Sequence, residues 1–296
     1  MPKIPSQADP GAAGELEAEL AGIDVLEYPL QAKLPRAKVL WQETWPKLGA
    51  VALGLLVWQA VVASGWKPDY LLPGPAATFG ELGKQWADGS LPEAMRNTMA
   101  LAAQGFGLAL VIGTLLGICI SASAILRRAL GSLITGLQTM PSIAWFPLAI
   151  VLFVGGEKAI FFVVVLGAAP SVANGIIHGI DHIPPILLNV GRVLGARGLA
   201  AYRYVVLPAA FPSFVGGLKQ GWAFSWRSLM AGELLVSISE GKSLGHSLED
   251  ARTLSNYPGL LATMVVILLI GIVVDALFFG RLEKLVRQRW GLKEAT

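Results

Sequence analysis

The chain has 296 residues, of which 54% are hydrophobic and only 15% are charged. Soluble domains carry about a quarter charged residues, so this composition argues against an ordinary soluble protein and indicates a membrane protein. The formal net charge of +3 excludes little, and the single cysteine, Cys119, excludes an intramolecular disulfide and gives no metal-site spacing.

Residues 1–44 precede the first long apolar run. The first 14 are polar and lack the basic start and apolar core of a secretory signal. Apolar residues then recur at roughly helical spacing between positions 16 and 30. We therefore expect a cytoplasmic N-terminal segment, partly disordered, with one short amphipathic helix at the surface.

Six segments have the length and apolarity that a transmembrane helix needs, about 20 residues each. We expect an all-α polytopic protein whose six-helix transmembrane domain occupies residues 45–282, followed by a cytoplasmic tail at 283–296. The predicted spans are about 47–65, 98–122, 130–154, 159–179, 209–236 and 258–280.

The distribution of Lys and Arg sets the expected orientation. With both termini in the cytoplasm, most basic residues fall in inside segments, as the positive-inside rule requires. The segment 182–208 is then a cytoplasmic loop between the fourth and fifth spans. Its basic residues are Arg192, Arg197 and Arg203.

Small residues recur along two of the predicted spans. Such ridges let helix backbones approach closely, and helix packing explains them without any further role. The ridge in the second span is Gly105, Ala109, Gly113 and Gly117, and the ridge in the fifth is Gly217, Gly221, Ser225, Ser228 and Gly232.

The other side of the fifth span carries three ionisable residues. A charge at the bilayer centre costs about 2.5–3.5 kcal/mol on insertion scales, so these residues should face the bundle interior or a water-filled path. Snorkelling of Lys219 to the surface and an interfacial position for Glu233 remain alternatives. The predicted path-lining residues, which share an arc of about 140°, are Lys219, Trp222, Trp226, Arg227, Met230 and Glu233.

Two prolines, Pro141 and Pro147, interrupt the predicted third span. Each removes a backbone hydrogen bond, so bends or broken turns are expected where neighbouring helices or a cavity satisfy the freed groups. The bulky residues beside them form either an apolar gate or ordinary packing. The candidate gate residues are Met140, Pro141, Trp145 and Phe146.

The loop at 182–208 has the features of a short amphipathic helix. Pro184 and Pro185 can open a helix but not continue one, and Gly195 and Gly198 permit a tight helix end. Pro208 is expected to mark the turn into the fifth span. The candidate functional residues of this loop are Ile186, Leu187, Val190, Arg192, Leu194, Gly195, Arg197, Gly198, Leu207 and Pro208.

The spacing of this loop resembles the EAA loop of ABC importer permeases, in which a Gly is followed by nine residues and then Ile-x-Leu-Pro. Here Gly195 precedes Val205-Val206-Leu207-Pro208 at that distance, although Asn189-Val190-Gly191 replaces the EAA triplet. Residues 139–176, 231–251 and 270–290 resemble the permeases for sulfonates, taurine, nitrate and bicarbonate. The resemblance extends over about residues 45–292 and implies the type I importer permease fold.

That resemblance also implies a mechanism and partners. The EAA-like loop would form a coupling helix that docks on a separate ATPase through the candidate loop residues named above. Two ATP-binding subunits, a second permease copy that forms a homodimer, and an extracytoplasmic solute-binding protein would complete the importer in the bacterial cytoplasmic membrane, with no nucleic acid involved. The chain itself is expected to be non-catalytic and to bind no cofactor, with ATP and Mg on the partner subunit.

Positive charges at Lys219 and Arg227 favour a small oxyanion as cargo, while Glu233 opposes that attraction. Two other functional classes are weighed against the importer. An autonomous secondary transporter or channel would use Lys219, Arg227 and Glu233, with Asp275, as an ion relay. A membrane-embedded enzyme would need a convergent catalytic set, which the scattered histidines do not supply.

Overall fold

The computed structural model describes residues 36–236 and 241–290, and those residues are almost entirely helical. The amphipathic helix expected between positions 16 and 30 lies outside them. The chain divides into two units, Met1–Ala60 and Val61–Thr296, which are treated separately below.

The first unit contributes most of α2 (Arg36–Ala63), which contains the first predicted span. Its stretch Thr44–Ala63 is long and apolar enough to cross a membrane, and most of its side chains are exposed. Exposed apolar side chains on a helix of this length are compatible with a lipid surrounding.

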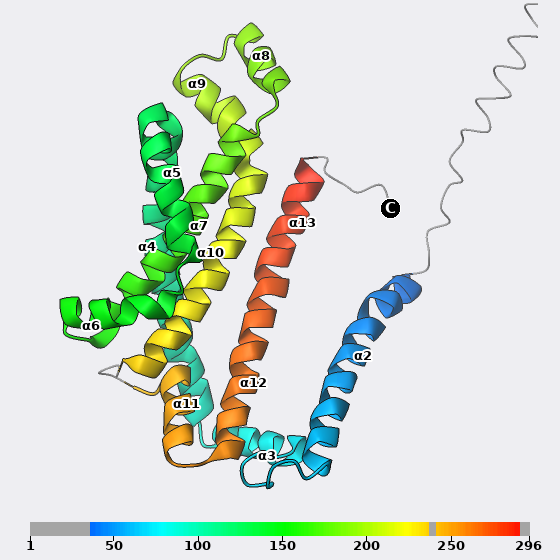
Figure 1. Ribbon diagram of the computed structural model, residues 1–296. Helices are drawn as coiled ribbons and strands as arrows, with labels where there is room; N and C mark the ends of the chain where they lie inside the picture. Colours follow the sequence, from blue (N-terminus) through cyan, green and yellow to red (C-terminus); the bar gives the residue numbers. More distant parts are fainter. Residues whose placement is uncertain (1–35, 237–240, 291–296) are drawn as a thin grey trace, which may run out of the picture. The chain divides into compact units, whose positions relative to one another are not determined.

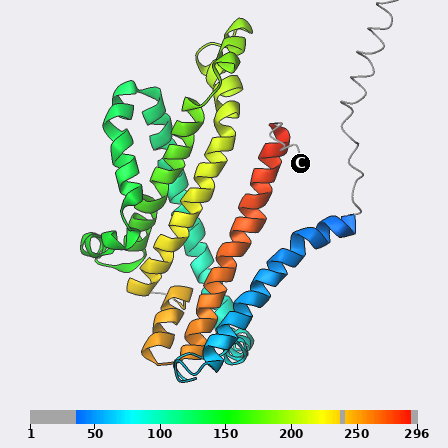
Figure 2. The ribbon, with the colours of Figure 1, turned by 45° about the vertical axis from the view of Figure 1, so that its right-hand side comes forward.

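The second unit is a helical bundle (Figures 1 and 2). Its elements, in chain order, are α3 (Pro75–Ala87), α4 (Ser90–Ala122), α5 (Ala124–Thr139), η1 (Ser142–Trp145), α6 (Phe146–Phe153), α7 (Gly156–Asp181), α8 (Pro185–Val193), α9 (Leu199–Ala201), η2 (Tyr202–Val206), α10 (Leu207–Leu235), α11 (Leu244–Thr253), α12 (Tyr257–Val273), η3 (Val274–Phe279) and α13 (Gly280–Arg289).

Helix α7 lies at the centre of this bundle, between α4 and α10 (Figure 1). The ridge of small residues predicted on α4 packs against it, and all four members are buried. A Cβ on Gly113 would lie 2.5 Å from the carbonyl oxygen of Ala169, and one on Gly117 would lie 3.0 Å from that of Ala173. The packing role predicted for this ridge is confirmed.

The α7–α10 crossing is equally close. A Cβ on Gly175 would lie 2.7 Å from the Cα of Gly217, and a Cβ on Gly179 would lie 2.7 Å from the carbonyl oxygen of Ala210. All members of the predicted α10 ridge are buried. Backbone-to-backbone contact therefore determines the separation of these two helices, as small residues in membrane helices allow.

The predicted third span is not one straight helix. α5 ends at Thr139, and the segment Ser142–Phe153 leaves it at an angle of 102°. Met140 adopts an extended backbone (ψ 127°), as expected for a residue before a proline, and Pro141 has no N–H to continue the helix. The break expected at Pro141 is confirmed, whereas Pro147 lies in the first turn of α6 and does not interrupt it.

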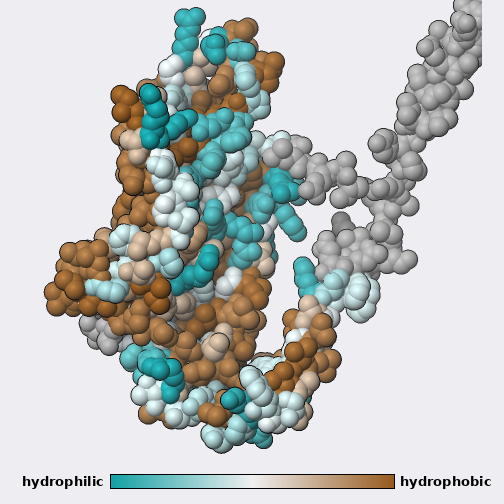
Figure 3. Space-filling model, viewed as in Figure 1, coloured by the Kyte–Doolittle hydropathy of each residue, from teal (hydrophilic) through white to brown (hydrophobic). Residues whose placement is uncertain are grey.

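Fewer than the six predicted spans satisfy the criteria of length and apolarity. Among the described residues, four helices satisfy both conditions, or five if the bent pair forms one crossing. α10 is long enough but is not among them, because its charged and polar residues lower its mean hydropathy. Its burial against α7 explains how it tolerates them. Apolar side chains gather on the surface over α6 and the lower part of α12 (Figure 3).

Candidate functional site

Helix α8 lies at one end of the bundle with α9, beyond the ends of α7 and α10 (Figure 1). It begins at Pro185 and ends in a Schellman motif. In that motif the Ala196 N–H donates to the Gly191 carbonyl at 2.9 Å, and the Gly195 N–H donates to the Arg192 carbonyl at 3.1 Å. Gly195 has φ +83°, so the tight helix end predicted there is confirmed.

One side of α8 packs on the bundle and another is left open. A Cβ on Gly191 would lie 2.7 Å from the Cγ2 of Val205, so this glycine brings α8 onto η2. The apolar side chains on the remaining arc are exposed, from 43% for Leu187 to 87% for Val193. Sequence analysis missed both Gly191 and Val193. The exposed apolar face of α8 consists of Ile186, Leu187, Val190, Val193 and Leu194.

The basic residues predicted beside this face, Arg192 and Arg197, are also exposed. Gly198 has φ +54° and precedes α9. From Leu199 the chain runs as one continuous helix through η2 into α10, so the expected turn at Pro208 is wrong and the turn lies at Gly195–Gly198 instead. The π-helical turn η2 ends at Val206, and Pro208 lies in the first turn of α10.

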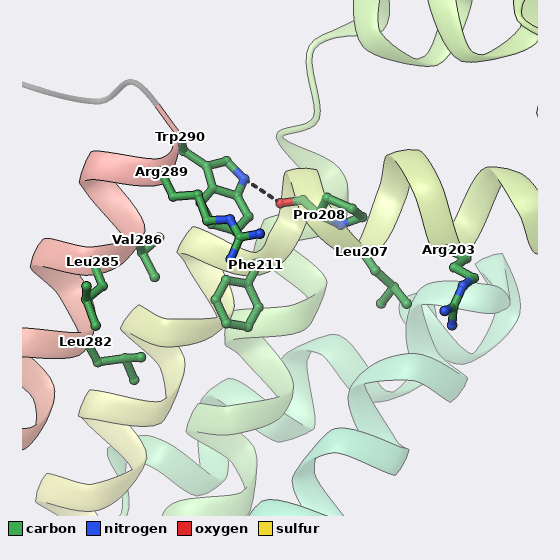
Figure 4. Close-up of a pocket in the computed structure, with 9 residues that line it drawn as sticks. All are labelled: Arg203, Leu207, Pro208, Phe211, Leu282, Leu285, Val286, Arg289 and Trp290. Carbon is green, nitrogen blue, oxygen red and sulfur yellow. Dashed lines mark hydrogen bonds between the residues drawn. The ribbon is translucent and has the colours of Figure 1, made fainter.

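A second proline in α10 explains a contact with the C-terminal helix. Pro212 has no N–H, so the Pro208 carbonyl four residues earlier has no intrahelical donor. The indole Nε1–H of Trp290 donates to that carbonyl at 2.7 Å, and the Trp290 ring stacks on Phe211 with centroids 5.5 Å apart (Figure 4). Trp290 thus replaces the backbone donor that Pro212 lacks.

The role of the Trp290 indole as a replacement donor can be tested with a double mutant. We expect Trp290→Phe to lower the free energy of unfolding by about 1 kcal/mol, because the Pro208 carbonyl loses its donor. In a Pro212→Ala background, where a backbone N–H is available, the hydrogen-bond part of that loss should disappear. Thermal unfolding in detergent measures both.

The exposed Trp86 provides the control, since Trp86→Phe should leave the unfolding midpoint unchanged. An equal cost of Trp290→Phe in both backgrounds would contradict this account of Pro212.

The six residues predicted to line a path on α10 do not form one surface. Lys219 pairs with two carboxylates, its Nζ lying 3.4 Å from Asp275 Oδ1 and 3.7 Å from Glu283 Oε2. Asp275 lies in the π-helical turn η3 and Glu283 in α13. The charge of Lys219 is therefore compensated within this chain.

The two tryptophans of the predicted path are buried. Trp222 and Trp226 stack with ring centroids 6.1 Å apart, and Trp222 also meets Phe106 edge-on. They belong to the main apolar core, and Met230 packs against it partly buried. In this chain they act as packing residues between α10 and its neighbours.

Arg227 is exposed and differs from these residues. Its Nε donates to the Ala223 carbonyl one turn earlier at 3.0 Å, and its guanidinium lies 4.8 Å from the centroid of the Phe224 ring. None of the ion pairs among the described residues joins it to a carboxylate, Glu233 included. Arg227 therefore keeps its positive charge without compensation.

Glu233 is buried (1% exposed) at the other end of α10. Its Oε2 accepts hydrogen bonds from Thr98 Oγ1 at 3.0 Å and from the Gly245 N–H at 2.9 Å. Thr98 Oγ1 in turn accepts from the Leu244 N–H at 2.9 Å. Glu233 thus joins α4, α10 and the first turn of α11, where a carboxylate is favoured, and it does not lie exposed at an interface.

These bonds predict a difference between two substitutions at Glu233. We expect Glu233→Ala to destabilise the chain by about 3 kcal/mol, because it leaves buried donors of Thr98 and Gly245 unpaired. Glu233→Gln retains an acceptor oxygen and should cost about 1 kcal/mol. Hydrogen exchange of the Leu244 and Gly245 amides, with thermal unfolding, measures the effect.

Glu249→Ala is the matched control, since Glu249 lies on α11 and its carboxylate binds Arg252 and Thr253 within that helix. Slow exchange at Gly245 in the Glu233→Ala protein would contradict the assigned contact.

The four candidate gate residues are also divided. Met140 and Pro141 lie exposed at the break after α5, whereas Phe146 is 1% exposed and Trp145 packs partly buried beside it. A Cβ on Gly232 would lie 3.0 Å from the Cζ of Phe146, so Phe146 packs against α10.

A polar contact near that break was missed in the sequence. Gln138 on α5 donates to Ser171 Oγ at 2.9 Å and accepts from Asn174 Nδ2 at 2.7 Å, both on α7. The available signal was two amide side chains within apolar segments, which in a membrane bundle tend to bind each other. Within the described ranges, no three His, Cys, Asp or Glu side chains are placed to hold a metal ion.

Comparison with known proteins is consistent with these features. A model of the family described as binding-protein-dependent transport system inner membrane component matches residues 109–288. The nitrate import permease of Synechocystis sp. is 29% identical over 246 residues, covering 80% of this chain and 87% of that protein. The bicarbonate transport permease of Synechococcus elongatus is 28% identical over 232 residues, covering 75% and 82%.

A riboflavin transport system permease of Chloroflexus aurantiacus is 29% identical over 265 residues, covering 88% of this chain and 97% of that protein. Among solved structures, an inward-facing MetNI methionine ABC transporter matches with a TM-score of 0.55 and 19% identity. The match covers 65% of this chain and 94% of that one. It shows a shared fold.

Proposed function

Because the chain belongs to the family of binding-protein-dependent transport system inner membrane components, we propose that it forms the translocation path of an ATP-driven importer and is moved by separate ATPase subunits. Its relatives are transport permeases, which are non-catalytic membrane subunits. The observation that carries this proposal is the exposed apolar face of α8.

That face has the properties of a docking surface. Large apolar side chains gathered on one exposed helix mark a site where another protein binds. Gly191, beside this face, packs against Val205 of η2, and η2 leads directly into α10. A protein that moves α8 would therefore also move α10, which packs against the central helix α7. A coupling helix must transmit motion in this way.

The assembly follows from the same proposal. Two copies of this chain form the path, two ATP-binding subunits dock on their α8 helices, and a solute-binding protein delivers cargo to the opposite side. ATP and Mg bind to the ATPase subunits, and this chain binds no cofactor. The α8 end and both termini face the cytoplasm of a bacterial inner membrane, in agreement with the positive-inside rule.

The proposed cargo is a small oxyanion such as nitrate, bicarbonate, taurine or an alkanesulfonate. Two relatives carry names of nitrate and bicarbonate permeases. The uncompensated charge of Arg227 supports an anionic cargo, whereas Lys219 is already paired with Asp275 and Glu283. Arg227 is thus the residue of α10 that we assign to the path.

Reconstitution in liposomes tests the proposal. The chain, its co-purifying ATPase and the solute-binding protein should together take up labelled nitrate, bicarbonate or taurine only when ATP is supplied. Arg227→Gln should lower oxyanion uptake about tenfold while ATPase binding is retained. Uptake by the chain alone without ATP would favour the secondary transporter, and ATP-driven uptake of riboflavin alone would refute the oxyanion assignment.

A further inference from the structure

An open groove of about 540 Å³ lies between the start of α10 and the end of α13, at the same end of the bundle as α8 (Figure 4). Most of its lining is apolar and includes the stacked rings of Phe211 and Trp290. The groove is lined by Arg203, Leu207, Pro208, Phe211, Leu282, Leu285, Val286, Arg289 and Trp290.

Two arginines from different helices, Arg203 and Arg289, lie on either side of the groove (Figure 4). None of the ion pairs among the described residues joins either of them to a carboxylate. The guanidinium of Arg203 lies 5.8 Å from the centroid of the Tyr204 ring. By contrast, Arg287 on the same α13 pairs with Glu283 at 3.5 Å. The groove is thus positively charged and lined without a carboxylate.

The depth of the groove in a membrane follows from its helices. Tyr257–Arg289 is one helical stretch of 33 residues, long and apolar enough to cross a bilayer, and Arg289 and Trp290 stand at its end. Tyr202 and Tyr204 are exposed at the facing helix. Aromatic and basic residues at the ends of membrane helices mark the headgroup level, which places the groove where lipid phosphates lie.

We propose that this groove binds an anionic phospholipid. The acidic headgroup lies between Arg203 and Arg289, and an acyl chain covers Phe211, Leu282 and Leu285. Basic pockets between membrane helices recognise such headgroups, and arginine is well suited to phosphate oxygens. The indole N–H of Trp290 already donates to the Pro208 carbonyl, so it is not available to the headgroup. The two arginines are therefore the donors that we assign to the headgroup.

Native mass spectrometry of the full-length chain in detergent, titrated with phosphatidylglycerol or phosphatidylcholine, tests this site. We expect one phosphatidylglycerol to bind at least tenfold more tightly than phosphatidylcholine. The double variant R203Q/R289Q should reduce that preference at least fivefold. Leu285→Asp, a change at an exposed position, should weaken both lipids. The matched control R281Q/K284Q removes two exposed charges of α13 outside the groove and should keep the preference.

Four results would overturn the proposal. The first is equal binding of the two lipids by the unaltered chain. The second is an equal effect of the groove variant and the control, which would indicate general electrostatic attraction. The third is displacement of phosphatidylglycerol by millimolar inorganic phosphate, which would indicate a site for free oxyanions. The fourth is a change from dimer to monomer in the groove variant, which would indicate an interface between copies. Circular dichroism verifies that each variant is folded.

Discussion

Gly217→Leu is expected to prevent α7 and α10 from packing and to destabilise the folded chain by about 3 kcal/mol or more. A Cβ at this position would lie 2.6 Å from the Cα of Gly175 and 3.0 Å from the Ser171 carbonyl oxygen. Both are backbone atoms, so no side-chain rotation can relieve the clash and the helices must separate. Fluorescence-detected size exclusion and thermal unfolding in detergent measure the loss.

The adjacent Gly216 provides the control for this prediction. A Cβ there meets nothing within 4 Å, so Gly216→Leu adds the same volume to the same helix without a clash. We expect this variant to keep the unfolding midpoint within about 2 °C. Comparable losses from both substitutions would show that α10 tolerates leucine poorly at any position, and the close α7–α10 crossing would lose its support.

The second large effect concerns the exposed apolar face of α8. Leu187→Asp and Val190→Asp together should weaken ATPase binding by at least about 30-fold, because apolar residues at the centre of an interface commonly contribute 2 kcal/mol or more. Both side chains are about half exposed in the free chain, so folding should be unaffected. Co-purification and ATP-driven uptake would be measured together.

Asn189→Asp is the matched control for α8. Asn189 is exposed on the same helix, outside the apolar face, and the change introduces the same charge. Unchanged ATPase binding in this variant, with loss in the double variant, would assign the contact to the apolar face. Undiminished binding in the double variant would place the ATPase contact elsewhere on the chain.

Local patterns predicted much of this molecule. The four-residue recurrence of small side chains on α4 and α10 predicted their packing, because spacing along a helix determines which residues share a face. Pro185 and Gly195 similarly predicted both ends of α8, since one residue favours a first turn and the other a left-handed C-terminus. The break at Pro141 followed from the same backbone chemistry.

Contacts between distant segments could not be predicted in this way. Glu233 binds Thr98, which is 135 residues away, and Trp290 binds Pro208, which is 82 residues away. A helical arc grouped Glu233 with Lys219 and Arg227, but it could not show which neighbouring helix each side chain meets. The arc identified ionisable residues that needed partners, and the partners came from tertiary packing.

The continuity of α10 has a mechanical consequence. Its 29 residues extend about 43 Å at about 1.5 Å per residue. The Pro208 carbonyl at one end is held by Trp290, and Glu233 near the other end is held by Thr98 and Gly245. Both ends of α10 are therefore hydrogen-bonded to other helices, and the helix between them can transmit a rotation from one end to the other. A tilt of about 5° at the α8 end would move the α11 end by about 4 Å over that length, enough to exchange one set of hydrogen-bond partners for another.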